Sequence, residues 1–168
     1  MIDDRALPAS LIQSLVESGR IYADKRGNAV FLLLGKGNNP IGAEIRGTTA
    51  ARWRGMAPGS QKDLGYFFIP NPGATTAVLC ESAIDALSCF VLYPNYLCMS
   101  TSGARPNPRW LPSLIHQGFE IYCGFDSDPA GNTMAQAMIG LFPEVKRLRP
   151  GQNDWNDVLK AHSARPSA

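Results

Sequence analysis

Two acidic residues, separated by a single residue, follow an apolar segment that is typical of a buried strand. Asp126 and Asp128 follow the run from Phe119 to Phe125. In an extended backbone, residues i and i+2 point to the same side, so both carboxylates can converge on one hard cation such as Mg²⁺. Asp128 followed by Pro129 is equally typical of a helix start with the acid as N-cap. Asp126 has no such structural role, and the pair therefore favours a metal site.

Acidic residues follow two further apolar segments in the same way. Glu81 comes directly after a predicted strand that ends at Cys80, and Asp85 lies one helical turn further on. The helix dipole alone also favours acids in a first turn, which is the structural alternative for both. A third strand is followed by the segment from Asp154 to Asp157. Carboxylates after three strands are typical of divalent-metal chemistry at the carboxyl edge of a parallel sheet.

The elements that would position these acids change character at the turn cluster Asn71-Pro72-Gly73. Before it, one helix and a strand pair indicate a small α+β unit. After it, strands and helices alternate, which indicates a parallel sheet covered on both faces. We predict domains at 1–72 and 73–162, and a disordered tail at 163–168. The expected helices are 8–18, 82–92, 108–117, 130–141 and 155–161, and the expected strands are 29–34, 41–45, 66–69, 75–80, 96–100, 119–125 and 145–148.

The strand-end acids resemble those of the Toprim domain, which is shared by bacterial-type primases, type IA and type II topoisomerases, OLD-family nucleases and recombination proteins. The resemblance rests on Glu81, on Asp126-x-Asp128 with Pro129-Ala130-Gly131 behind it, and on Asp154-Trp155-Asn156-Asp157. It implies a Rossmann-like α/β fold with a mostly parallel sheet flanked by helices. It also implies Mg²⁺, with Mn²⁺ as the alternative cofactor, and phosphoryl transfer.

The same resemblance implies a role for each acid. Asp126 and Asp128 are expected to be the primary metal ligands and catalytic residues. Glu81 is expected to be a further metal ligand or the general acid/base, and Asp154 to complete a second metal position. The residues expected to support this site without binding the metal are Asp85, Asn156 and Asp157.

The first 72 residues resemble the segment that precedes Toprim in primase-like proteins of plasmids and other mobile elements. This resemblance rests on residues 22–31, 42–48 and 59–63. Residues 1–72 hold nine lysines and arginines against six acids, whereas residues 73–168 hold seven against eight. We expect the basic half to contact nucleic-acid or nucleotide phosphates, and a solvated surface loop is the structural alternative for each side chain. The candidates are Arg46, Arg52, Arg54 and Lys62, joined by Arg105 from a later loop.

Composition limits the classes of protein to which this chain can belong. At 168 residues with 45% hydrophobic content, the chain can bury a core. It has no apolar run of about 18 residues and no secretory signal at Met1, so we expect a cytoplasmic protein that does not contact a membrane. The four cysteines lack zinc-site spacing and are expected to be reduced core residues.

Three functions are compatible with these residues. The first is a primase-like nucleotidyltransferase that makes short RNA primers on single-stranded DNA from nucleoside triphosphates, in mobile-element replication or transfer and with a helicase or relaxase as partner. The second is an OLD-like metal-dependent nuclease, which needs the same acids but no triphosphate site. The third is a DNA-binding accessory protein with a degenerate site, which the intact acids disfavour.

Overall fold

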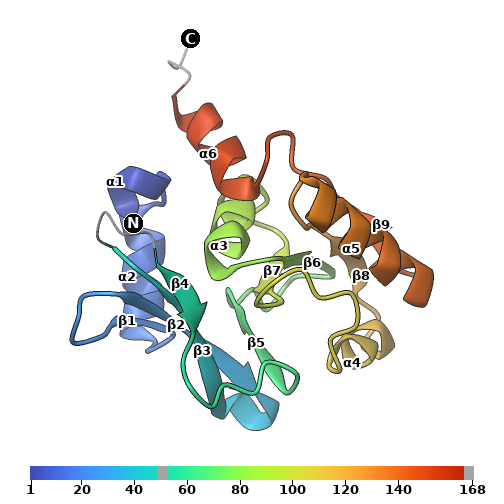
Figure 1. The fold of residues 1–168 in the computed structure, drawn as a ribbon, viewed down its shortest axis with the longest axis horizontal. Coiled ribbons are helices and arrows are strands. Elements are labelled where there is room, and N and C mark those ends of the chain that lie inside the picture. The colour runs from blue at the N-terminus through green and yellow to red at the C-terminus, as the bar shows by residue number, and fades with distance from the viewer. Residues whose placement is uncertain (49–52, 165–168) are drawn as a thin grey trace.

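The first half of the chain forms two helices and an antiparallel set of strands. The computed structural model describes residues 1–48 and 53–164 (Figure 1). Strands β1 to β3 pair as neighbours in sequence, and β4 pairs with β3 at the edge of the sheet. The elements are α1 (Ile2–Arg5), α2 (Ala9–Glu17), β1 (Ile21–Ala23), β2 (Ala29–Gly35), a 3₁₀ turn (Lys36–Asn38), β3 (Pro40–Arg46), β4 (Arg54–Met56) and β5 (Gly65–Phe68).

The second half alternates strands and helices, as the sequence predicts. Its four strands are all parallel and stand in the order β7-β6-β8-β9. The central strand β6 is buried along its whole length, which explains its uninterrupted apolar sequence. The elements are β6 (Thr76–Cys80), α3 (Ala83–Leu92), β7 (Leu97–Ser100), α4 (Leu111–His116), β8 (Glu120–Cys123), α5 (Pro129–Leu141), β9 (Lys146–Arg147) and α6 (Trp155–Ser163).

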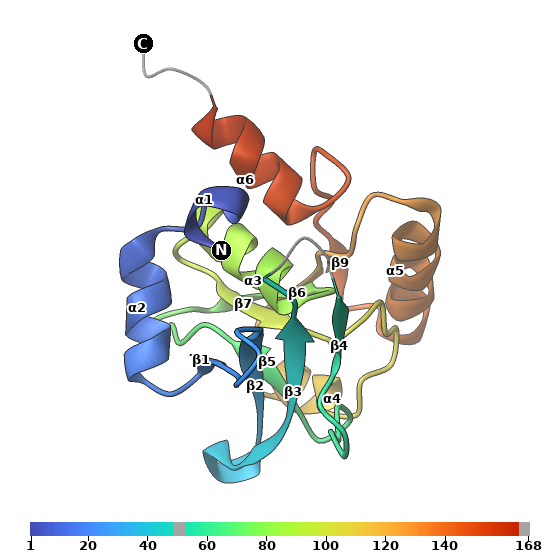
Figure 2. The same ribbon diagram turned by 60° about the vertical axis from the view of Figure 1, so that its left-hand side comes forward.

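Strand β5 joins the two halves into one nine-stranded sheet. It pairs antiparallel with β2 through Tyr66 opposite Leu34, and antiparallel with β7 through Phe67 opposite Ser100. Figure 2 shows β3 and β4 standing in front of the parallel strands rather than apart from them. Glu44 of β3 accepts a hydrogen bond from the N–H of Ala83, just beyond the end of β6, and this contact places the acids near the basic half.

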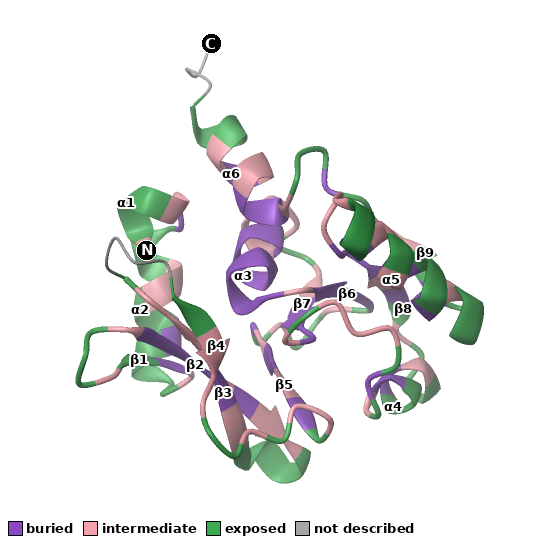
Figure 3. Cartoon of the chain, in the orientation of Figure 1, coloured by how far each residue is buried: buried purple, intermediate pink, exposed green. Residues whose placement is uncertain are grey.

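The core lies on both faces of the sheet. Val78 and Cys80 of β6 belong to one buried cluster, and Ala77 and Leu79 belong to another, because alternate residues of a strand face opposite ways. Helices α2, α3 and α6 cover the first face, and α4 and α5 cover the second. Figure 3 shows that α3 is buried around most of its circumference, whereas α5 is exposed on its outer side.

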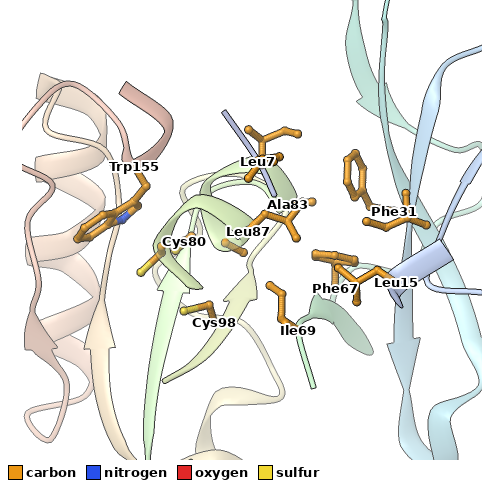
Figure 4. Packing of buried hydrophobic residues seen from close by; sticks show 14 of the residues in the cluster. Leu7, Leu15, Phe31, Phe67, Ile69, Cys80, Ala83, Leu87, Cys98 and Trp155 are labelled. Atoms are coloured by element: carbon orange, nitrogen blue, oxygen red, sulfur yellow. The ribbon is translucent and has the colours of Figure 1, made fainter. Parts of the chain in front are cut away.

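The first cluster contains side chains from both halves of the chain. Leu7, Phe31 and Phe67 pack in the same buried group as Leu87 and Trp155 (Figure 4). Phe31 and Phe67 meet edge to face, with ring centroids 5.4 Å apart. The turn cluster at residues 71–73 thus lies in the sequence between two segments that share one core.

The four cysteines are free and buried, as expected from the sequence. Three of them, Cys80, Cys89 and Cys98, lie in the first cluster, and Cys123 lies in the second. Burial raises the pKa of Cys80 to about 12 and that of Cys123 to about 11. Both therefore stay protonated at neutral pH and behave as small apolar side chains.

The predicted elements are present, but several short ones were not foreseen. Helix α1 and strands β1 and β4 have three or four residues each, too few for a periodic pattern. Ser163, assigned from the sequence to a disordered tail, is instead the last residue of α6, and residues 165–168 lie outside the described part. Within the described residues, every helix is too short or too polar to cross a bilayer.

Candidate active site

A cavity of about 530 Å³ opens between the antiparallel strands and the carboxyl ends of β6 and β8. It collects charged side chains from segments spread over the chain, from α1 to α6. Side chains of both charges line this cavity, because acids that follow the parallel strands share it with Arg46 of β3 and Arg54 of β4. The charged lining consists of Glu44, Glu81, Asp85, Asp126 and Asp154, together with Arg5, Arg46 and Arg54.

Strand pairing brings the first two acids together. Leu79 of β6 lies opposite Cys123 of β8, so the residues that follow the two strands leave the sheet side by side. Glu81 Oε1 accepts a hydrogen bond from the backbone N–H of Asp126 at 3.1 Å. Glu81 and Asp126 are therefore in direct contact, as parallel strands ending at one edge require.

Gly131 leaves the room that this contact needs. A Cβ at Gly131 would lie 2.5 Å from the carbonyl oxygen of Asp126 and 2.8 Å from Glu81 Oε1. The first of these atoms is backbone and cannot rotate away. The glycine in the sequence Asp128-Pro129-Ala130-Gly131 is thus required by packing against the acids, not by its own backbone angles.

Arg147 fixes the loop that carries Asp126. Its guanidinium donates to three backbone carbonyls around that loop, those of Cys123 at 3.0 Å, Phe125 at 2.8 Å and Asp126 at 3.0 Å. It also donates to the side chain of Asn132 at 3.2 Å. Sequence analysis missed this residue, since it lies on the two-residue strand β9 and its partners Phe125 and Asp126 are 22 and 21 residues away in sequence.

Asp126 is the most perturbed acid of the cavity. Burial, followed by the charges of Asp85, Glu81 and Asp154, raises its pKa to about 8. Within the described residues its buried Oδ1 has no hydrogen-bond partner. A buried carboxylate oxygen without a donor is costly, and a bound cation would remove that cost.

Two neighbouring acids are perturbed in the same direction. Burial raises the pKa of Asp85 to about 7, although Ser82 Oγ donates to its Oδ2 at 2.5 Å. Burial also raises the pKa of Glu81, with Asp128 contributing and Arg147 opposing. The cavity thus holds several acids that repel one another, which is the electrostatic condition that a divalent cation relieves.

The acidic side chains of the cavity offer the type of ligand atom that a hard divalent cation prefers. Every acidic donor is a carboxylate oxygen, the type that Mg²⁺ and Mn²⁺ prefer, and Asp126 Oδ1 is left without a protein partner. In residues 1–48 and 53–164, no three acidic, histidine or cysteine side chains are placed to share one ion. The side chains would therefore have to move toward a bound metal.

The other two predicted ligands cap helices. Asp128 Oδ1 accepts from the N–H of Gly131 at 2.7 Å at the start of α5, and Asp128 does not line the cavity. Asp154 Oδ1 accepts from the N–H of Asp157 at 2.7 Å at the start of α6, and Asp154 does line the cavity. The capping alternative for Asp128 is therefore realised in this structure, and its role as a metal ligand stays a prediction.

The predicted phosphate contacts divide into two groups. Arg46 and Arg54 lie opposite each other on β3 and β4 and line the cavity. Lys62 and Arg105 do not: the Arg105 guanidinium donates to the carbonyl of Lys62 at 2.8 Å and forms an ion pair with Asp63. Arg52 lies outside the described residues.

The predicted supporting residues also differ in position. Asp85 and Asn156 line the cavity and are buried. The Asn156 amide accepts from Arg5 at 3.2 Å and donates to Ser88 Oγ at 3.0 Å. Asp157 instead forms an ion pair with Lys160 at 2.9 Å, away from the cavity lining.

Glu44 is a buried member of the cavity that sequence analysis did not single out. Its side chain is on β3, and the residue is 3% exposed. It accepts from the N–H of Ala83 at 3.0 Å, from Ser102 Oγ at 3.0 Å and from Ser100 Oγ, and it pairs with Arg46 at 3.6 Å. The available signal was an acid between the apolar residues Ala43 and Ile45, which is unusual in a buried strand.

Two family models together match most of the chain. Residues 78–159 match a family model described as Toprim-like, and residues 1–73 match one described as a protein of unknown function, DUF3991. A curated relative, the 65 kDa protein of Zymomonas mobilis subsp. mobilis, is 30% identical. That match covers 83% of this chain, but only 27% of the relative, so the chain spans about a quarter of that protein.

Comparison with solved structures gives the fold. The primase fragment of the bacteriophage T7 primase-helicase protein aligns with a TM-score of 0.73 at 16% identity, covering 97% of this chain and 70% of that one. A DnaG primase catalytic domain bound to ssDNA aligns with a TM-score of 0.61 at 13% identity, covering 95% and 68%. The predicted α/β fold with helices on both faces of a largely parallel sheet is confirmed.

Proposed function

We propose that this chain, whose residues 78–159 are a Toprim-like domain, is a metal-dependent nucleotidyltransferase of the primase type. It would join ribonucleotides into short primers on a single-stranded DNA template. The observation that carries the proposal is the shared cavity, in which three strand-end acids face two arginines of the basic half. A nuclease needs the acids, but a polymerising enzyme also needs cations that hold a triphosphate.

Each group in the cavity has a task in this proposal. Asp126 and Glu81 would hold a divalent cation, with Asp154 completing the set. When bound, that cation supplies charge neutralisation of the phosphates and a lower pKa for the attacking hydroxyl. Arg46 and Arg54 bind the triphosphate oxygens, while Arg147 and Gly131 keep Asp126 and Glu81 in place.

The similarity to primase structures also suggests substrates and partners for this chain. A similar fold is found in a DnaG domain solved with ssDNA and in a fragment of a primase-helicase protein. We therefore propose single-stranded DNA and nucleoside triphosphates as substrates, Mg²⁺ or Mn²⁺ as cofactor, and a helicase or relaxase as the partner that delivers the template. Replication or transfer of a mobile element is the proposed setting.

The test is one incubation of the purified chain with end-labelled single-stranded DNA and differently labelled ribonucleotides, in Mg²⁺ or Mn²⁺. We expect short ribonucleotide products from the wild type. Asp126→Asn should abolish them while the circular dichroism spectrum stays unchanged, because the substitution removes charge but little volume. The matched control is Asp4→Asn, an exposed acid outside the cavity lining, which should retain activity.

Three results would contradict this proposal. Full turnover by purified Asp126→Asn would exclude Asp126 as a catalytic metal ligand. Shortened DNA without ribonucleotide products would favour the nuclease. No change in either label would favour a binding role.

A further inference from the structure

Trp53 is an exposed aromatic residue in the lining of the same cavity. The residue directly precedes β4 and is 52% exposed. The other exposed large apolar residues of the described chain, such as Tyr22 and Leu64, do not line this cavity. The proposed mechanism uses the acids and arginines of the cavity and assigns no role to the Trp53 indole.

The indole packs against the backbone of β4 at Gly55. Trp53 and Gly55 are two residues apart, so they lie on the same side of the extended chain. A Cβ on Gly55 would lie 2.8 Å from Trp53 Cζ2 and 3.1 Å from Cη2. The Trp53 carbonyl is held by the N–H of Gly47 at 2.7 Å. A glycine here therefore makes room for the ring, and the ring is supported while half of the residue stays open to solvent.

Positive charge lines the same cavity as this ring. Arg54 follows Trp53 in sequence, and Arg46 lies opposite Arg54 across the β3–β4 pair. Within the described residues, the buried Nε of Arg46 has no hydrogen-bond partner. Guanidinium N–H groups are strong donors to phosphate oxygens, and this one has no acceptor within the described residues.

We infer that Trp53 stacks on the base of a bound nucleoside triphosphate, an inference that rests on the proposed function. One cavity holds the indole, the two arginines and the acids, which are the groups that the base, the phosphates and the metal of a bound nucleotide would each need. Its volume of about 530 Å³ lies in the range of small-ligand sites. Stacking on an indole tolerates every base, as a template-directed enzyme requires, because all bases have a π face.

The experiment compares two probes that differ only in the nucleoside. Binding of ATP and of inorganic tripolyphosphate to the 168-residue chain is measured by calorimetry in Mg²⁺. Trp53→Leu should weaken ATP binding roughly ten-fold and leave tripolyphosphate binding unchanged. Trp53→Phe should restore most of the ATP affinity. Tyr22→Leu, which changes another exposed aromatic, is the matched control and should change neither.

The outcomes separate this inference from the proposed function. If wild type binds both probes and Trp53→Leu binds ATP normally, the stacking inference is wrong and nucleotidyl transfer is untouched. Loss of affinity for a labelled single-stranded oligonucleotide without loss for ATP would assign the indole to the template, which also overturns the inference. If wild type binds neither ATP nor tripolyphosphate, the proposed function fails and the stacking inference fails with it.

Discussion

Asp126 combines burial with the repulsion of neighbouring acids, and this makes stability depend on pH. Its pKa is raised to about 8, whereas an unfolded aspartate titrates near pH ~4. Between these values the folded chain keeps a proton that the unfolded chain has lost, so stability falls as pH rises through that window. In metal-free buffer, we expect the melting temperature of wild type to fall more steeply from pH 5 to pH 8 than that of Asp126→Asn.

Thermal melts followed by circular dichroism in EDTA check this prediction. Asp85 titrates in both proteins, so the difference between the two curves, and not either curve alone, reports on Asp126. Parallel curves would mean that Asp126 is ionised in the folded protein throughout this range.

Gly131 and Gly140 provide a matched pair of glycines in helix α5. Gly131→Ala places a methyl group against the Asp126 carbonyl and Glu81, so we expect destabilisation by about 1–3 kcal/mol and loss of activity. Gly140 is exposed and has nothing within 4 Å of an added Cβ. Gly140→Ala should therefore stabilise by about 0.5–1 kcal/mol with activity unchanged. Urea denaturation and the primer assay measure both, and equal effects at the two positions would contradict the packing argument.

At the residue scale, position after a parallel strand was sufficient to predict that Glu81 and Asp126 lie together, and Asp154 at the start of α6 lines the same cavity. The roles of all three stay predictions. This positional rule was not sufficient for Glu44, because its contacts reach Ser100, 56 residues away in sequence. Such a contact depends on which strands become neighbours, and no local pattern encodes that order. Asp128 is the opposite case, because its role is encoded locally. The sequence Asp128-Pro129 signals a helix start, and the Asp128 side chain caps α5.

Among the elements, β3 and α3 are joined through the Glu44 carboxylate. It accepts hydrogen bonds from the N–H of Ala83 at the first turn of α3, from the hydroxyl of Ser100 at the end of β7 and from the hydroxyl of Ser102 just after it. Glu44→Ala leaves these buried donors without an acceptor, so we expect a loss of about 3 kcal/mol. Glu17→Ala on α2 removes an exposed acid and should change stability by less than about 0.5 kcal/mol. Urea denaturation tests the pair, and a similar small change for both would show that Glu44 does not join the elements.

Periodicity predicted the long elements and failed on the short ones. Helix α3 and strand β6 follow clear apolar patterns and occur within one or two residues of the expected bounds. Strand β4, with the sequence Arg54-Gly55-Met56, has little strand propensity of its own and forms by pairing with β3. Helix α4 begins at Leu111 rather than at residue 108, since a turn from Pro108 precedes it.

For the whole molecule, the shared sheet and core predict cooperative unfolding. Strand β5 links the two sets of strands, and one buried cluster contains both Phe31 and Trp155. Neither half could unfold without exposing apolar surface of the other, so we expect one transition. Urea curves from tryptophan fluorescence and from far-ultraviolet circular dichroism should coincide. Two separated midpoints would instead support independent units at 1–72 and 73–162.

The four buried thiols can report how fast the core of this protein opens. None can be alkylated or exchange with an aromatic disulfide while the core is closed, because all are buried. Cys80, Cys89 and Cys98 sample one face of the sheet and Cys123 the other. The rates at which the individual cysteines acquire a label under native conditions therefore time the opening of each face separately. No probe has to be introduced, since the chain already carries one on either side of its central strands.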